Sequence, residues 1–311
     1  MVIHSLHSVV LDDTSDTVLG GMISGNATTG LEQEANAKSG EAYVRHRSVI
    51  RIGPSLSFTT KNVKEAYDAI GLTGLNIGGL ATGIVAYLQQ HDQGGLRVAG
   101  STHLSYTYKH GLLRLGTLSV SHRAAATLSV ESAISFDGTN TPVIEAATVA
   151  LPTLPAQTEY TLDDAASSIG GVSLSNFRDI SVDFGVVAQT EGTDSAIYDT
   201  FAGIYTIMPI ITASGIDPEW LKSSNIPLGG LACTHANTIL YLRKRAHGGQ
   251  FVADGTAEHI KITAAGIANI ESIFESSSEN VSAPTTTGFV LHTHHDGTNT
   301  PLVFDTASAI T

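Results

Sequence analysis

Residues 137–142 read Asp-Gly-Thr-Asn-Thr-Pro, and residues 296–301 read the same six residues in the same order. The two copies are separated by an offset of 159 positions. Six identical residues in order rarely recur by chance, and a repeat at about half the chain length predicts a duplicated unit. Duplication is therefore the first hypothesis for the fold.

Further matches keep the same order along the chain, at offsets between 151 and 155. Insertions in loops produce such small drifts, because loops accept length changes that strands do not. The collinear order predicts two copies at about 9–143 and 160–302; the alternative is chance similarity in a sequence rich in Gly and Thr. The matched segments are Leu11–Asp13 with Leu162–Asp164, Ile52–Pro54 with Ile207–Pro209, Gly78–Ala81 with Gly229–Ala232, Tyr87–Leu88 with Tyr241–Leu242, and Gly94–Gly95 with Gly248–Gly249.

The repeat predicts three segments of chain. A first domain is expected at 1–144 and a second at 160–311. The segment 145–159 contains Pro152 and Pro155, which favour extended backbone, so we expect a linker there.

The composition favours a globular, mainly β protein. Hydrophobic residues make up 42% of the 311 residues and charged residues only 14%, which is enough to bury a core but sparse for a freely soluble monomer. The 31 glycines, together with abundant Thr and Ser, favour strands joined by tight turns. No window approaches ~18 uninterrupted apolar residues, and the N-terminal residues do not resemble a secretory leader. We therefore expect a protein made in a cytoplasm, without membrane insertion.

The charge balance argues against nucleic-acid binding. The formal net charge is −13, from 16 basic and 29 acidic residues, whereas binding to phosphates depends on Lys and Arg that release counterions. The one cysteine, Cys233, cannot form an intrachain disulfide, so nothing in the thiol chemistry requires an oxidising compartment.

Period-two alternation predicts the strands of the first copy. In 101–109, Leu104 and Tyr106 share one face and His103 and Ser105 the other, as in a half-buried strand. The other strands are expected at 43–52, 84–90, 112–121 and 126–136, with turns at 91–95, 109–111 and 137–138.

One helix is predicted in each copy. In the first, at 62–70, Val63, Tyr67 and Ile70 share a face, Asn62 and Glu65 resemble a capping box, and Gly71 follows as a stop. In the second copy, a helix is predicted near 217–223. Its expected start is Asp217 and Pro218, and its expected inward residues are Trp220 and Leu221.

The strongest candidate for a metal site is the run His292-Thr293-His294-His295-Asp296, since imidazoles and a carboxylate are transition-metal ligands. In a strand, however, His292 and His294 face one side and His295 the other. The equivalent turn of the first copy has no histidine before Asp137. We therefore predict that this cluster binds no metal and is dispensable.

No other pattern predicts chemistry. His103, His122 and His235 occur singly, and no nucleophile elbow, zinc-protease motif or phosphate-binding loop is present in the sequence. The basic run Arg243–Arg245 corresponds to uncharged residues and a histidine in the first copy, so we interpret it as a solvated or inter-subunit surface. We expect no catalytic, cofactor-binding or metal-binding residues, no cofactor, and no enzymatic activity.

The order of elements carries a family resemblance. A strand and a Thr-capped helix run through Phe58–Val63, a Gly-Gly turn follows, and long strands include Gly94–Arg97 and Gly111–Leu113. Together these resemble bacteriophage tail-tube proteins, whose fold is an antiparallel β-sandwich flanked by one helix. The resemblance implies two tandem antiparallel β-sandwich or barrel domains, each with one flanking helix. The weak similarity of the two copies departs from a strict repeat, so the domains need not have identical roles.

In that family, single-domain subunits form hexameric rings whose inner strands join into a continuous β-barrel. Members with two fused tube domains form trimers with pseudo-sixfold symmetry, and this chain resembles the fused kind. The resemblance thus implies a virion structural protein of the viral tail, assembled in the host cytoplasm into stacked trimeric rings. Its partners would be other tail proteins and the DNA that passes through the lumen without specific binding.

Two other functions stay open at this point. A duplicated binding module, such as an adhesin or a capsid or tail decoration protein, would expose aromatic or polar clusters and stay monomeric. A metal-dependent enzyme would use His292, His294 and a carboxylate, and would need bound metal and a pocket.

Overall fold

The computed structural model describes residues 2–11, 16–37, 39–40, 42–78, 83–121, 123–169, 172–173, 177–193, 196–215, 233–246, 248–275, 286–295, 298 and 300–311. The protein is mainly β, with 63% of residues in strands and antiparallel pairing between the strands. One short helix, α1 (Val63–Ile70), is present in the described residues. The expected mainly β, antiparallel fold is confirmed.

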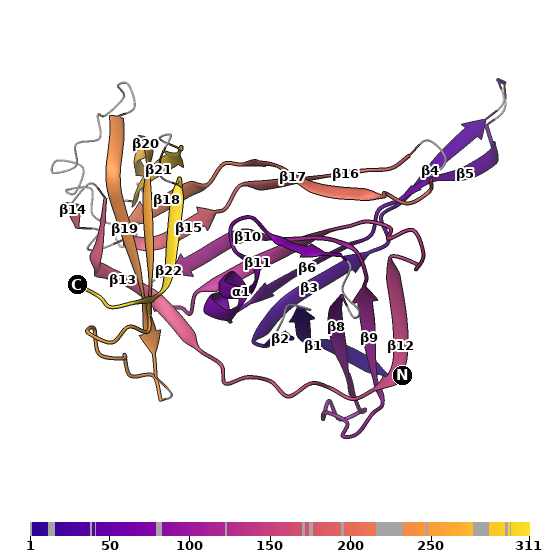
Figure 1. Ribbon diagram of the computed structural model, residues 1–311, viewed down its shortest axis with the longest axis horizontal. Coiled ribbons are helices and arrows are strands. Elements are labelled where there is room, and N and C mark those ends of the chain that lie inside the picture. The colour runs from indigo at the N-terminus through magenta and orange to yellow at the C-terminus, as the bar shows by residue number, and fades with distance from the viewer. Residues whose placement is uncertain are drawn as a thin grey trace, which may run out of the picture.

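Two large sheets and two hairpins make up the fold (Figure 1). The smaller sheet has the order β12-β9-β8-β1-β2, and the larger has thirteen strands with the main order β14-β13-β19-β20-β21-β18-β15-β10-β11-β6-β3. In the larger sheet, β22 also pairs with β20, and β7 with β10. The strands of the first half of the chain are β1 (Ile3–Leu11), β2 (Thr17–Leu19), β3 (Met22–Thr28), β4 (Leu31–Ala37), β5 (Val44–Ile52), β6 (Ser55–Thr60), β7 (Leu75–Ile77), β8 (Ile84–His91), β9 (His103–Tyr108), β10 (Gly111–Ser121), β11 (Thr127–Ile134) and β12 (Val143–Val149).

The second half contributes the remaining strands. They are β13 (Glu159–Ile169), β14 (Val172–Ser173), β15 (Phe177–Asp183), β16 (Val186–Glu191), β17 (Phe201–Ile207), β18 (Ile210–Gly215), β19 (Cys233–Arg245), β20 (His259–Glu275), β21 (Thr286–Thr293) and β22 (Leu302–Ser308). The expected linker 145–159 begins inside β12 and ends at the first residue of β13, with no regular element in 150–158. In Figure 1 this segment runs along the bottom of the molecule between the two halves.

The second half repeats the pairing order of the first. In the first half, β12, β9, β8 and β1 are successive neighbours, as are β10, β11, β6 and β3. In the second half, β22, β20, β19 and β13 are successive neighbours, as are β20, β21, β18 and β15. The one long strand β20 stands where the first half has β9 and β10.

Irregularities recur at matching positions as well. The register of β3 on β6 shifts between Met22 and Ser24, and that of β15 on β18 shifts between Phe177 and Asp179. Such bulges are specific features of a strand pair and are not required by strand pairing in general. Their recurrence at a constant offset therefore links the two halves residue by residue.

The apolar face of helix α1 determines how the helix packs on the core. Val63 and Ile70 are buried, and Tyr67 packs against the same core, as the sequence predicts. Gly71, with φ of +66°, ends the helix and donates its N–H to the Tyr67 carbonyl oxygen at 2.7 Å. The expected capping box is wrong: the Asn62 side chain makes no cap hydrogen bond, and Glu65 instead accepts from the Thr158 hydroxyl at 3.2 Å. The second helix, expected near 217–223, lies outside the described residues.

The first copy of the repeated hexapeptide forms a turn held by Asp137. Its Oδ1 accepts the backbone N–H of Thr139 at 2.8 Å and of Asn140 at 2.7 Å. A hydrogen bond from the Asn140 side chain, together with these backbone bonds, lowers the pKa of Asp137 to about 2. Gly138 adopts φ of +88°, which glycine accepts at little cost. Turn geometry therefore explains the spacing of Asp137, Gly138 and Asn140 in the first copy of the hexapeptide.

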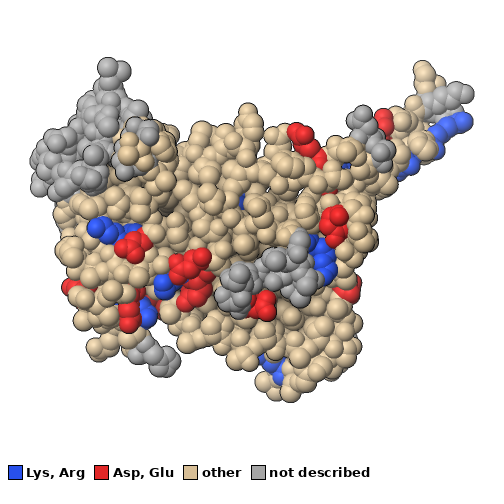
Figure 2. Space-filling view, viewed as in Figure 1, with Lys and Arg blue, Asp and Glu red and all other residues tan. Residues whose placement is uncertain are grey.

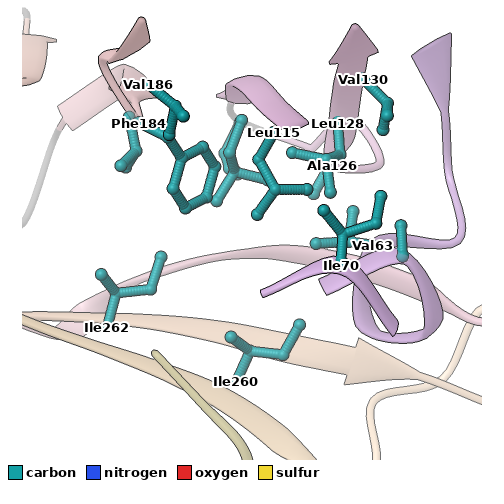
Figure 3. Close-up of a cluster of buried hydrophobic side chains, with 14 of the residues drawn as sticks. Val63, Ile70, Leu115, Ala126, Leu128, Val130, Phe184, Val186, Ile260 and Ile262 are labelled. Carbon is teal, nitrogen blue, oxygen red and sulfur yellow. The ribbon is translucent and has the colours of Figure 1, made fainter. Parts of the chain in front are cut away.

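The core is continuous between the two halves. Figure 3 shows Val63 and Ile70 of α1 between the β10–β11 layer and Ile260 and Ile262 of β20. The Tyr67 ring stacks on that of Phe304, from β22, with centroids 4.1 Å apart. Burial of such side chains stabilises by about 1.5–3 kcal/mol each, so α1 fastens the halves together.

Candidate assembly surface

The two halves join into one stretch of eight strands. Strand β10 pairs with β15, with Ser119 opposite Ser181. The stretch runs in the order β3-β6-β11-β10-β15-β18-β21-β20 and contains four strands from each half. We call its side away from α1 and the core the open face.

Small polar side chains cover the open face. Directly paired residues lie on the same face of a sheet, so Ser119, Ser181 and Thr212 form one row across three strands. Asn26, Ser57 and Glu131 form a second row. Two shallow grooves follow these rows, one of 310 Å³ across β10, β15 and β18 and one of 260 Å³ across β3, β6 and β11. Alternate residues in the same strands, such as Phe58 and Val182, are buried in the core.

The open face carries little positive charge among its described side chains. Arg114, opposite Glu131 in the second row, is paired with that residue at 2.7 Å, and Arg178 is exposed on β15 beside Asp179. Asp179 and Asp183 lie exposed on β15 in the same alternation as Ser181. The face is therefore neutral to acidic. On the side of the molecule drawn in Figure 2, charged residues are few and the two signs are interspersed.

Each end of the eight-strand stretch has an edge without a partner strand in the part of the chain that the structure describes. Strand β3 pairs with β6 on one side and is the last strand of the order. Residues 269–275 of β20 pair with β21 on one side, whereas the pairing of β19 with β20 ends at Ala268. Open strand edges carry unpaired N–H and C=O groups that accept a further strand.

Two hairpins project from this stretch. Strands β4 and β5 form arm 1, inserted between β3 and β6, and strands β16 and β17 form arm 2, inserted between β15 and β18. In Figure 1, arm 1 extends away from the body, whereas arm 2 lies across the top of the first half toward the base of arm 1. Exposed apolar side chains on the arms are Leu31, Val44, Val49, Ile50, Val187, Phe201 and Tyr205.

An ion pair ties arm 2 to the base of arm 1. Arg51 donates from Nε to Asp199 Oδ1 at 2.9 Å and from Nη2 to Oδ2 at 2.5 Å. The same guanidinium reaches Thr190 at 2.8 Å and Glu32 at 3.1 Å. The hydrogen bond from Arg51 holds the pKa of Asp199 below its usual value, and the bond to Asp199 raises the pKa of Arg51. Asp199 is only 4% exposed, so this is the most deeply set part of the contact between the arms.

The histidine cluster lies at the end of β21. His292 is exposed and pairs in register with Ile210, and His294 and His295 follow the strand, also exposed. Asp296 lies outside the described residues. Within the part of the chain that can be described, no three His, Cys, Asp or Glu side chains gather as a metal site would require. That the cluster binds no metal stays a prediction.

The basic run Arg243–Arg245 has local partners. Arg243 contacts Asp254 and Asp163, and Lys244 pairs with Glu258 at 2.7 Å. The guanidinium groups of Arg243 and Arg245 lie over the Phe251 ring, 4.8 Å and 5.5 Å from its centroid. These contacts occupy the positive charges within the chain, which disfavours phosphate binding.

Sequence reasoning missed two pairs of residues. Arg51 and Asp199 are 148 positions apart, and no local pattern links them. The single histidine His103 is buried, and His259 is its counterpart in the second half, also buried. The offset of 156 between these histidines fits the repeat and is the signal that could have found them. His122 and the side chain of His235 lie outside the described residues.

Comparison of the chain with known protein families and with curated protein sequences gave no match. Among the described residues, no helix has the length and apolar character needed to cross a membrane.

Proposed function

We propose that this chain is a virion structural protein, the subunit of a bacteriophage tail tube, and that it is not an enzyme. The observation that carries the proposal is the eight-strand stretch, which has a polar open face and, among the described residues, a strand edge without a partner at each end. Such edges promote uncontrolled aggregation unless they are covered. Closure of the stretch into a ring with other copies pairs every edge.

The two halves are proposed to be tandem tube-like domains, the first within 1–144 and the second within 160–311. The equal pairing orders and the matching bulges at Met22/Ser24 and Phe177/Asp179 support this. Two domains in one chain fill two of six positions in a pseudo-sixfold ring, so three chains close it. The contact is heterologous, and heterologous contacts form a ring when the rotation closes.

The open face would form the wall of the channel. Rows of Ser and Thr with few acidic side chains offer DNA little fixed positive charge, since Arg114 is paired with Glu131, and phosphates bind proteins mainly through Lys and Arg. DNA would therefore pass without specific binding. Rings would stack into a tube in the virion tail, assembled in the host cytoplasm with other tail proteins.

A reconstruction of the native particle without imposed symmetry tests the proposal. We expect three chains per ring, approximate sixfold symmetry, and Ser119, Ser181 and Ser57 facing the lumen. Six chains per ring, or a lumen lined by Lys and Arg, would refute the proposal. Purified protein at high concentration should form rings or tubes in negative-stain images.

A duplicated binding module is the second candidate. Tyr43 and Tyr205, which are 85% and 72% exposed, favour it because exposed aromatic side chains are common in binding sites. A module of this kind would stay monomeric and be found on the outside of a particle. The same reconstruction separates the two candidates by where the chain lies.

A further inference from the structure

Arm 2 is docked on the first half of its own chain. Arg114 of β10 donates to the Val186 carbonyl oxygen at the start of the arm. Beyond the arm's far end, Ile52 donates its N–H to the Ile197 oxygen at 2.8 Å, and Phe136 donates to the Asp199 oxygen at 2.6 Å. The first half thus holds arm 2 at both ends, and arm 2 crosses β10 and β11 between them.

Arm 1 has the same internal register, but the contacts described above hold only its base, through Arg51 and Ile52. Glu32 pairs with Arg51 and is followed by a register shift, and Val187 pairs with Thr206 and is followed by the same shift. Every residue of β4 is nevertheless exposed, whereas exposed residues alternate with covered ones along β16. A two-stranded hairpin alone is marginally stable in water. Arm 1 is therefore a docking element whose counterpart surface is not supplied by its own chain within the described residues.

The strand edges show the same asymmetry. Asn26 of β3 corresponds to Ser181 of β15. Asn26 lies opposite Ser57, the third residue of β6, and Ser181 lies opposite Thr212, the third residue of β18. Ser181 also pairs with Ser119 of β10, whereas within the described residues Asn26 pairs only with β6. On the other edge, Glu275 corresponds to Ser119, since these residues pair with equivalent positions of β21 and β11.

We propose that a second copy of this chain supplies both missing contacts in the geometry of the intrachain junction. Strand β3 pairs with β20 of the second copy so that Asn26 lies opposite Glu275. Arm 1 then lies across β20 and β21 of that copy, as arm 2 lies across β10 and β11. The inference rests on the proposed ring and deepens it, because it fixes the partner, the register and the docking surface of each arm.

The chain-to-chain junction lacks the two arginine contacts of the intrachain one. The position equivalent to Arg114 is Asn269, because Arg114 pairs with Glu131 and Asn269 with the equivalent Val290. The position equivalent to Arg51 is Thr206, and the position equivalent to Asp199 is Val44, at the constant offset of 155. The ion pair that fastens arm 2 thus has no counterpart where two chains meet. The three chain-to-chain junctions are accordingly the places where the ring opens first.

Cysteine pairs test the register in a Cys233→Ser background. Asn26→Cys with Glu275→Cys should link chains into disulfide-bonded dimers and trimers on mild oxidation, since paired residues in adjacent strands have Cα atoms about 4.5–5.5 Å apart. Ser119→Cys with Ser181→Cys is the matched intrachain control and should form a disulfide without linking chains. Thr28→Cys with Glu275→Cys is out of register by two residues and should link at least tenfold less.

A graft of the ion pair tests the docking of arm 1. Thr206→Arg together with Val44→Asp should place the missing pair at the junction between chains. We expect rings of the double variant to dissociate at a clearly higher denaturant concentration, and at a higher temperature, than wild-type rings. Rings of each single variant should dissociate under the same conditions as wild-type rings. Native mass spectrometry reports the dissociation.

The outcomes separate the two proposals. If trimers form but disulfides between chains appear only with Thr28→Cys and Glu275→Cys, or with neither cysteine pair, the proposed register is wrong while the ring stands. Trimers in which the double variant is no more resistant than the single variants would overturn the docking of arm 1. Monomers throughout, including in the native particle, would overturn the ring and the inference with it.

Discussion

His103 and His259 make the same hydrogen bond in the two halves of the chain. The Nδ1 atom of His103 accepts the backbone N–H of Gln90 at 3.2 Å, and that of His259 accepts the N–H of Lys244 at 3.1 Å. An accepting Nδ1 carries no proton, so this bond selects the tautomer with the proton on Nε2. Each ring anchors the loop that follows β8 or β19 to the next strand.

Replacing His259 with Ala should destabilise the protein by about 1–3 kcal/mol, because it leaves a buried N–H without an acceptor and opens a cavity. His103→Ala should behave alike. Urea denaturation measures the change. His292→Ala, at an exposed position, is the control and should stay within about 0.5 kcal/mol of wild type. Equal stability of all three variants would contradict the anchoring role.

The contact of Arg51 with Asp199 makes stability depend on pH. Because the folded-state pKa of Asp199 is lowered, its contribution is complete above the unfolded pKa of about 3.9 and is lost as pH falls through the folded pKa. Asp199→Asn should lower the free energy of unfolding by about 1–2 kcal/mol at neutral pH. This is the contribution of a hydrogen bond between charged groups, reduced because the Arg51 side chain is 40% exposed to solvent. The difference in unfolding free energy between this variant and wild type should disappear as the pH falls below about 4.

Denaturant midpoints of both proteins from pH 7 to pH 3 check this. Glu145→Gln, at an exposed position of β12, is the control and should follow wild type at every pH. A gap that stays constant down to pH 3 would show that the loss comes from packing and not from the ion pair.

Gly111 and Gly266 should resist any side chain. A Cβ on Gly111 would lie 2.3 Å from the Ala133 oxygen, and one on Gly266 would lie 2.1 Å from the His292 oxygen. Gly111→Ala and Gly266→Ala should each lower stability by roughly 1–3 kcal/mol through forced backbone shifts. Gly255→Ala, which meets nothing within 4 Å, is the matched control. Thermal melting of the three variants decides the point.

Positive charge on the open face should slow DNA. Ser181→Lys, or better Ser181→Lys with Ser57→Lys, should leave tubes intact but reduce the rate of DNA ejection, more strongly at low salt, since phosphate binding weakens as salt rises. Ser181→Gln controls for side-chain size. Ejection at the wild-type rate from particles that carry the lysine variant would argue against this face as the channel wall.

The cluster of His292, His294 and His295 should bind no stoichiometric metal. Elemental analysis of protein purified without an affinity tag should find less than one tenth of an equivalent of zinc, nickel or iron per chain. A full equivalent that is lost in His292→Ala would contradict the prediction and favour the metal-dependent alternative.

Much of the fold could be predicted from the sequence because its signals are local. Strands at the positions of β5, β8, β10 and β11 and the buried face of α1 are expected from the sequence, and both are confirmed. The burial of His103 and Ser105 in β9 was not predictable, because the apolar face of Leu104 and Tyr106 is the more obvious core face. In that strand, partners from β8 and β12 decide which face is covered.

The assembly surface could be predicted only in outline. The repeat of Asp137–Pro142 indicates that the chain has two similar halves, but nothing in it reveals that β10 and β15 pair. Contacts such as that of Arg51 with Asp199 depend on how the halves are placed in space. A single sequence carries no local signal for such distant pairs.

The stacking of Tyr67 on Phe304 also determines when the first half can finish folding during synthesis. The ring of Tyr67 leaves the ribosome long before Phe304 is made, a delay of roughly 10–50 s at ordinary rates of translation. During that time the flank of α1 that Phe304 covers stays bare, although β15 is made earlier and can already pair with β10. The first half therefore completes its surface only after β22 has emerged.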